Sequence, residues 1–261
     1  MQISHNRIIS NYRLFFFKAI LFYIFTLVPA YSNDLKIGSI TEIIGEVIAI
    51  TEEGDERILD NLDEIFLKDE ILIGESSSAT LQFDDNTTIV MKELTSLNVS
   101  EFENSGVKKT FQAKVGKGKI IIESGAIAKN SNGEMLIDLS NMSLGIRGTR
   151  FNASIKPNGN SEVSLAEDSF GNVGQIEITS EGQTSNLTST DQVVEVSETN
   201  EVVQRDQSEE EKQELKSLNE TLVKVSKIDE NELTEQLQEK LTRGKLQDAN
   251  NDGIVNETDI E

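Results

Sequence analysis

The residues whose types and spacing best fit a chemical role lie in the last fourteen positions, 248–261. Oxygen-bearing side chains alternate along the chain at Asp248, Asn250 and Asp252, and Gly253 follows, where a sharp turn is permitted. Alternate carboxylate and amide oxygens around such a turn are the ligands with which a loop surrounds Ca²⁺. The spacing therefore predicts a calcium site.

Three further positions complete the expected ligand set. Ile254 would contribute its backbone carbonyl, Asn256 would act through a water molecule, and Asp259 would close the loop. The run resembles one half of a dockerin repeat, or an EF-hand loop whose last ligand is Asp instead of Glu. A single loop of this kind predicts a dissociation constant of about 10⁻⁴ to 10⁻³ M, as in extracellular modules. The alternative is an acidic tail that binds no metal.

Two groups of basic residues are weaker candidates. Arg147 and Arg150 flank the turn Gly148-Thr149, and in an acidic protein such arginines pair with carboxylates more often than they bind ligands. We therefore predict a structural ion pair there. A positive island without intervening acidic residues consists of Lys108, Lys109, Lys114, Lys117 and Lys119. The island suits an anionic glycan, a lipid headgroup or the acidic tail of the chain itself.

Signals for catalysis are poor, and we predict that the protein is not an enzyme. Ser105 and Lys108 have the S-x-x-K spacing, but the companion motifs of a serine nucleophile are missing. The stretch 116–119 (GKGK) lacks the register of a phosphate-binding loop and joins two predicted strands. The single histidine is His5, and there is no cysteine, which excludes disulfides and thiolate metal sites.

The charge balance narrows the class of partner. The chain has 46 acidic and 24 basic residues, for a net charge of −22. Such an excess repels nucleic-acid phosphates and anionic lipids, so we expect no nucleic-acid partner. The acidic excess is instead compatible with cation binding or with simple solubility.

Residues 1–32 have the pattern of a signal peptide. Arg7, Arg13 and Lys18 precede the apolar run 19–28, and small residues surround the expected cleavage point after Ser32. We therefore expect a periplasmic or secreted bacterial protein without a stable membrane span after cleavage. The alternative is an uncleaved anchor, because an apolar segment at 14–17 would extend the run.

Residues 38–203 form a succession of short apolar runs separated by turn residues, which predicts an all-β domain. Apolar residues alternate with polar ones over 79–83, and Asp84-Asp85-Asn86 interrupts the pattern before the next run, as in a β-hairpin. With joints at glycine every 10 to 20 residues, the predicted fold class is mainly β, an elongated β-solenoid or a sandwich of short strands.

The composition changes at residues 208–244, which we predict to be helical. Ser208 and Glu211 form a capping box, and an apolar stripe at helical spacing follows. The stripe consists of Leu215, Leu218, Leu222 and Val225, and a second stripe consists of Leu233, Leu237 and Leu241. The abundant charge allows two arrangements, a helical hairpin packed on its own β-domain or a coiled coil that binds a partner.

The order of the motifs resembles the FecR family. The segment 145–151 (GIRGTRF) is similar to a late turn of the FecR domain, and 67–74 and 77–87 are similar to an earlier step and hairpin. Asn86 stands where that hairpin commonly has glycine. Gly45-Glu46-Val47 and the stretch 120–125 also fit, so the resemblance covers roughly residues 38–200.

The resemblance implies an extracytoplasmic β-domain that, in the family's regulators, receives a signal from an outer-membrane transporter and passes it to a sigma factor. About 13 residues precede the apolar segment that begins at Leu14, so we expect that a sigma factor is not the direct partner. The function expected is a binding or scaffold protein for an envelope protein or glycan. The alternative is an accessory subunit, or an enzyme acting on polysaccharide, that is held by a dockerin-like attachment.

Overall fold

The computed structural model describes residues 35–213, 215 and 216. They form seventeen β-strands, the short helix α2 (Ala126–Lys129) and the first turns of a helix that starts at Glu209. The predicted signal peptide at 1–32, the calcium loop at 248–261 and most of the helical segment 208–244 lie outside the described residues. Among the described residues, no helix has the length and apolar character needed to cross a membrane.

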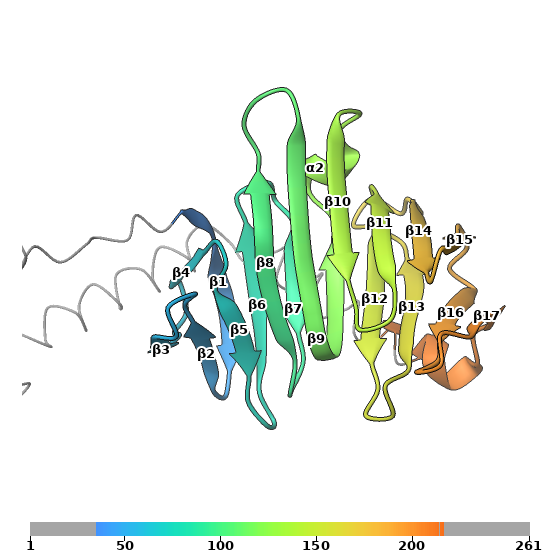
Figure 1. The fold of residues 1–261 in the computed structure, drawn as a ribbon, viewed down its shortest axis with the longest axis horizontal. Helices are drawn as coiled ribbons and strands as arrows, with labels where there is room; N and C mark the ends of the chain where they lie inside the picture. Colours follow the sequence, from blue (N-terminus) through green and yellow to red (C-terminus); the bar gives the residue numbers. More distant parts are fainter. Residues whose placement is uncertain (1–34, 214, 217–261) are drawn as a thin grey trace, which may run out of the picture. The chain divides into compact units, whose positions relative to one another are not determined.

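The strands follow one another closely along the chain (Figure 1). The first nine are β1 (Lys36–Ile44), β2 (Val47–Ile50), β3 (Glu56–Ile58), β4 (Glu64–Phe66), β5 (Glu70–Ile73), β6 (Ser78–Phe83), β7 (Thr88–Met91), β8 (Ser96–Glu103) and β9 (Lys109–Glu123). The other eight are β10 (Gly133–Asp138), β11 (Ser143–Arg147), β12 (Arg150–Ile155), β13 (Ser161–Ala166), β14 (Gln175–Ser180), β15 (Gln183–Leu187), β16 (Gln192–Val196) and β17 (Val202–Asp206).

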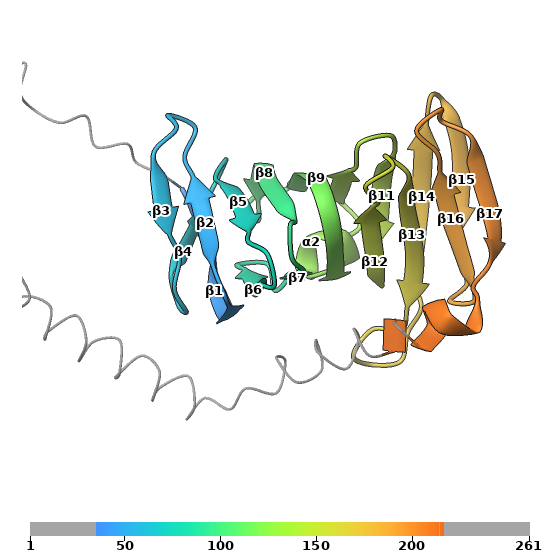
Figure 2. The ribbon, with the colours of Figure 1, turned by 90° about the horizontal axis from the view of Figure 1, so that it is seen from below.

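The strands pair into two open sheets. Sheet A has the order β4-β1-β6-β7-β9-β12-β13-β16-β17. Sheet B has the order β3-β2-β5-β8-β9-β10-β11-β14-β15. All neighbours are antiparallel except β9 and β10. Figure 2 shows β8 and β11 in one layer and β6, β7 and β12 in the other. The mainly β prediction is thus confirmed, with the layered arrangement of a sandwich.

Strand β9 belongs to both sheets. Its first part, up to Lys117, pairs with β8 in sheet B, and its second part, from Gly118, pairs with β12 in sheet A. Gly118 has φ +83°, and a Cβ there would collide with the backbone and side chain of Thr95. The GKGK stretch, predicted to join two strands, is therefore the bend of one strand that crosses between the layers.

The core lies between the two sheets. Alternate residues of each strand point inward, which is the pattern predicted over 79–83, where β6 buries Ala79, Leu81 and Phe83. Phe83 and Phe111, one from each layer, pack edge to face with their ring centroids 5.1 Å apart. Phe102 adds a second such contact on Phe111 at 5.7 Å. The alternation thus assigns one face of each strand to a shared apolar layer.

The predicted hairpin at Asp84-Asp85-Asn86 joins β6 to β7 and also holds α2. Asn86 takes the left-handed conformation, with φ +65°, which asparagine tolerates better than most residues. The buried carboxylate of Asp85 accepts hydrogen bonds from the Thr87 backbone N–H and hydroxyl at 2.9 Å each, and from the Ile127 N–H of α2 at 3.2 Å. The acidic turn is therefore structural.

Candidate functional site

Six residues form a continuous row across the face of sheet A that points away from sheet B. Each is the registered neighbour of the next, and all but Val193 lie between two residues that point into the core. We call them the outer row: Thr80 (β6), Val90 (β7), Ile121 (β9), Asn152 (β12), Ser164 (β13) and Val193 (β16). All six are buried, although they belong to the outer face.

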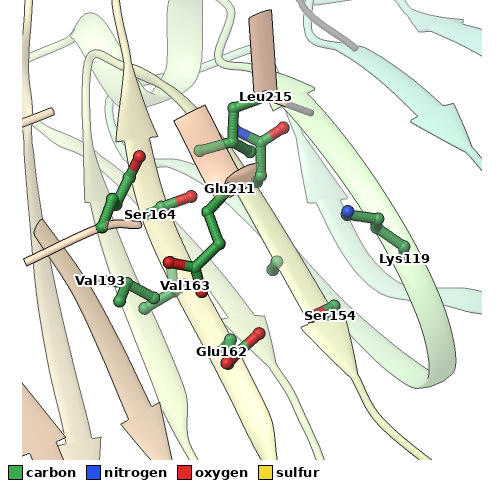
Figure 3. Close-up of a pocket in the computed structure, with 11 residues that line it drawn as sticks. Lys119, Ser154, Glu162, Val163, Ser164, Val193, Glu211 and Leu215 are labelled. Atoms are coloured by element: carbon green, nitrogen blue, oxygen red, sulfur yellow. The ribbon is translucent and has the colours of Figure 1, made fainter. Parts of the chain in front are cut away.

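A pocket lies over the β16 end of the outer row (Figure 3). Its cavity volume is about 50 Å³, which is enough for a small polar group. Sheet A supplies the floor with Asn152, Ser164 and Val193. Glu211 and Leu215 of the helix that follows β17 contribute the opposite side. The pocket thus lies at the junction between the sheet and the C-terminal helix.

The amide of Asn152 is the unusual group of this pocket. Its side chain is 3% exposed, and neither Nδ2 nor Oδ1 has a hydrogen-bond partner in the described structure. A buried amide without partners loses its hydrogen bonds to water and gains none, which costs about 1–3 kcal/mol. Such groups are rare in folded proteins, and each requires an explanation. Here the amide lines a pocket, where an incoming polar group can pair with it.

A charged cluster borders the pocket, with Arg205 of β17 at its centre. The Arg205 guanidinium donates to both carboxylate oxygens of Glu211 at 2.9 and 2.7 Å. It also lies 3.4 Å from Glu162 and 3.8 Å from Glu195. Lys156 Nζ donates to Glu162 at 2.5 Å. The carboxylates at the mouth of the pocket are thus held by cations of the same chain.

The same contacts set the protonation of the cluster. The hydrogen bond from Arg205 is the main reason that the pKa of Glu211 falls to about 2, and the bonds from Ser208 add to the effect. The pKa of Glu195 is lowered first by the hydrogen bond from Asn160. Both carboxylates are therefore charged at neutral pH, and neither has the raised pKa of a general acid.

The predicted capping box fixes the helix at this place. Ser208 N–H donates to Glu211 Oε2 at 2.7 Å, and Glu211 N–H donates to the Ser208 hydroxyl at 3.2 Å. This is the reciprocal pattern expected from the sequence. The prediction is confirmed for the helix start.

A second arginine, Arg150, also lies on the outer face of sheet A, and unlike Arg205 it is buried. Arg150 of β12 donates to Glu123 of β9 through Nε and Nη2, and its Nη2 also donates to the Ser169 hydroxyl at 2.8 Å. Burial raises the pKa of Glu123, but the bonds from Arg150 and Ser169 outweigh it, so the pKa lies below its ordinary value. The predicted ion pair is confirmed for Arg150. Arg147 instead donates to the Gly133 carbonyl at 2.8 Å.

The remaining basic and serine candidates have structural partners. Ser105 donates to Glu103 at 2.5 Å, while Lys108 forms an ion pair with Glu134 at 3.1 Å. The two residues of the S-x-x-K spacing are therefore engaged separately, and no activated serine results. Lys109 donates to Asn104 at 3.2 Å. The island is thus partly neutralised in the described structure.

The predicted calcium ligands are not among the described residues. Asp248, Asn250, Asp252, Ile254, Asn256 and Asp259 all lie beyond residue 216. Within residues 35–216, apart from position 214, no group of three or more His, Cys, Asp or Glu side chains is placed to hold a metal ion.

Sequence reasoning missed Asn152. The alternation along β12 places its side chain on the outer face, which predicts exposure to solvent. Its burial depends on residues far away in the sequence, such as Leu215. The only available signal was its position directly after the GIRGTRF segment.

Comparison with known proteins identifies the central part of the chain. Residues 69–174 match the family model described as FecR protein. The match is narrower than the predicted domain at 38–203, and it contains strands β5 to β13. Asn152, Arg150 and Glu123 lie within it, whereas Arg205 and Glu211 lie beyond it. The chain therefore carries a FecR-like domain, which points to a non-enzymatic protein family.

Solved structures add weaker likenesses. Two crystal structures of a proposed anti-sigma factor from Parabacteroides distasonis are each 13% identical, cover 53% of this chain and 60% of that one, and have a TM-score of 0.43. A cell surface anchoring domain is 36% identical over 23% of this chain and 80% of its own length, with a TM-score of 0.23. No curated protein matches the chain. TM-scores this low do not establish a shared fold.

Proposed function

We propose that this chain, whose residues 69–174 form a FecR-like domain, is an extracytoplasmic, non-catalytic binding or scaffold protein. We place its binding site at the pocket on sheet A. The observation that carries this assignment is the buried, unpartnered amide of Asn152 on the floor of that pocket. A site that costs stability while it is empty is typical of a position selected for binding.

The chemistry of the pocket indicates the kind of group that would enter. An amide offers a donor and an acceptor side by side, which complements a peptide group or the neighbouring hydroxyls of a sugar. The floor also carries the hydroxyl of Ser164 and the apolar side chain of Val193. We therefore expect an uncharged polar group of an envelope protein or glycan.

The surrounding charges support binding over catalysis. Glu162 and Glu211 are the acidic residues that line the pocket, and both are paired with Arg205. Glycoside hydrolysis needs one carboxylic acid that keeps its proton near neutral pH, and the low pKa of Glu211 is the opposite condition. The pair thus suits a structural role.

The experiment compares retention of envelope components by three full-length chains: wild type, Asn152→Leu, and the control Asn186→Leu on edge strand β15. Wild type and control should retain the same protein or glycan, and Asn152→Leu should lose at least about tenfold in affinity, as when a bound polar group loses its partners. Direct binding of a purified sigma factor, or polysaccharide cleavage that Glu162→Gln abolishes, would contradict the proposal.

Location and calcium belong to the same proposal and rest on the sequence. The sequence pattern of a signal peptide at 1–32 supports export, and mass spectrometry of the native protein should find Asn33 as the first residue. The loop from Asp248 to Asp259 should bind Ca²⁺ with a dissociation constant of about 10⁻⁴ to 10⁻³ M. Calorimetric titration with Ca²⁺ should compare the wild type with an Asp248→Ala, Asp252→Ala double variant. Equal heats of binding for the two proteins would exclude a calcium site in this loop.

A further inference from the structure

The burial of the outer row requires a cover on the side away from sheet B. Val90 is 1% exposed and Ile121 is 0% exposed, and the two form a hydrophobic cluster separate from the core between the sheets. An isoleucine on a bare sheet face would be largely exposed to water. Apolar side chains buried to this degree need apolar atoms above them.

The described end of the chain shows where such a cover begins. The helix that starts at Glu209 is fixed by its capping box and by the bond between Arg205 and Glu211. Its residue Leu215 lines the pocket together with Asn152 and Ser164 of the outer row. The apolar side of this helix therefore faces the outer row at the β13 and β12 positions.

We propose that the helix continues past Lys216 and that residues 217–225 lie along the outer row as its cover. The apolar stripe determines which side faces the sheet. Leu218, Leu222 and Val225 follow Leu215 at intervals of three and four, so they lie on the same side of a continued helix. Ser217, Glu220 and Lys224 lie on the opposite side and would face water.

The dimensions of the two elements agree. Neighbouring strands are about 4.8 Å apart, so the outer row spans about 24 Å from Val193 to Thr80. A helix rises about 1.5 Å per residue, which places Leu222 about 10 Å beyond Leu215. Along the row, the pair Val90 and Ile121 lies two strand spacings, about 10 Å, beyond the pair Asn152 and Ser164. Leu222 would thus contact the separate hydrophobic cluster.

This cover goes beyond the proposed function and does not depend on it. It assigns the outer face of FecR-matched strands to a segment of the same chain that lies outside the match.

Hydrogen–deuterium exchange of the full chain tests the cover from both sides of the contact. In wild type the amides of residues 217–228 should be protected. Leu222→Asp on the helix and Ile121→Asp on the sheet should each reduce this protection by about tenfold or more, and the double variant should add little, because both remove one contact. Ser217→Asp, on the opposite side of the helix, should change it by less than about twofold.

Three results would overturn the proposal: exchange of 217–228 at the unprotected rate in wild type, equal effects of Leu222→Asp and Ser217→Asp, or protection that survives the substitution at Ile121. If Ile121→Asp does not fold, Ile121→Thr serves as the milder variant on the same side chain. A concentration-dependent dimer whose 217–228 segment exchanges freely would assign the face to a second copy and would equally refute an intramolecular cover.

Discussion

Two arginine–carboxylate groups on the same face of sheet A use the same chemistry in different surroundings. Arg150 and Glu123 have side chains that are 4% and 16% exposed, whereas Arg205 and Glu211 are 36% and 30% exposed. The first pair joins β9 to β12 at the centre of the FecR-matched region, and the second holds the start of a helix outside it. Exposure decides what each pair contributes, because water screens the second much more than the first.

The comparison shows which ion pair tolerates the loss of one partner and which does not. A buried pair that loses one partner leaves an uncompensated charge in a low-dielectric site. A partly exposed pair that loses one partner lets the other turn to water. We therefore interpret Arg150–Glu123 as a fixed part of the sheet and Arg205–Glu211 as a latch for the helix, whose release leaves the sheets intact.

The largest effect is expected at the buried pair. Arg150→Ala leaves the mostly buried carboxylate of Glu123 with only Ser169 as a partner, and it should lower the free energy of unfolding by about 3–5 kcal/mol. Chemical denaturation followed by circular dichroism measures this loss. A loss below about 1 kcal/mol would mean that the pair is solvated as well as Arg205–Glu211 is.

Asn152, beside Arg150 on the outer face, should respond in the opposite direction. Asn152→Leu replaces an unpartnered amide with an apolar side chain of similar size, and the free energy of unfolding should rise by about 1–3 kcal/mol. Thermal unfolding in the absence of any ligand is the measurement. A variant less stable than wild type would show that the amide has partners in solution, and the pocket assignment would fall with it.

The latch should have an intermediate effect. Glu211→Gln weakens both the bond to Arg205 and the capping box, and about 1 kcal/mol of helix stability should be lost. Hydrogen–deuterium exchange should become faster for the backbone amides that follow Ser208, while the amides of β12 and β13 should keep their protection. Equal loss in helix and strands would refute the distinction between latch and sheet.

The pH dependence of the latch has a definite sign. The pKa of Glu211 is lowered from 4.5 to about 2, so its charged form is the one that the folded state favours. The stabilisation is complete above pH 4.5 and disappears as the pH falls toward 2. Wild type and Glu211→Gln should therefore differ in stability at neutral pH and converge at about pH 2, as measured by denaturation at several pH values. A constant difference would exclude Glu211 as the titrating group.

The smallest effect is expected at the edge of the cluster. Lys156 pairs with Glu162 and is 41% exposed, so Lys156→Ala should change stability by less than about 1 kcal/mol. The change should shrink further at high salt, because exposed pairs are screened. Denaturation at low and high salt distinguishes this pair from Arg150–Glu123, whose contribution should persist.

Local patterns were predictable wherever neighbouring residues decide the structure. The β6–β7 hairpin, the capping box at Ser208 and the ion pair of Arg150 all follow from residues close together in the chain or from the charge balance. Helix α2 was missed because four residues are too short for helical periodicity, and Asp85, which is distant in sequence, supplies a hydrogen bond at its start.

The crossing of β9 was missed for a related reason. Gly116 and Gly118 indicate a break in the pattern, but the same residues are compatible with a loop between two strands and with a bend within one. The choice depends on β8 and β12, which pair with the two halves of β9 in different sheets.

By itself, the sequence determined that the chain is mainly β, that its charge is strongly acidic, and that its central motifs resemble the FecR family, because composition and alternation act at short range. The tertiary structure alone decided that Thr80, Val90, Ile121, Asn152, Ser164 and Val193 form one buried row. These residues come from six strands and meet only through the register of sheet A. Burial of an outward-facing side chain depends on what packs above it, and no local pattern contains that information.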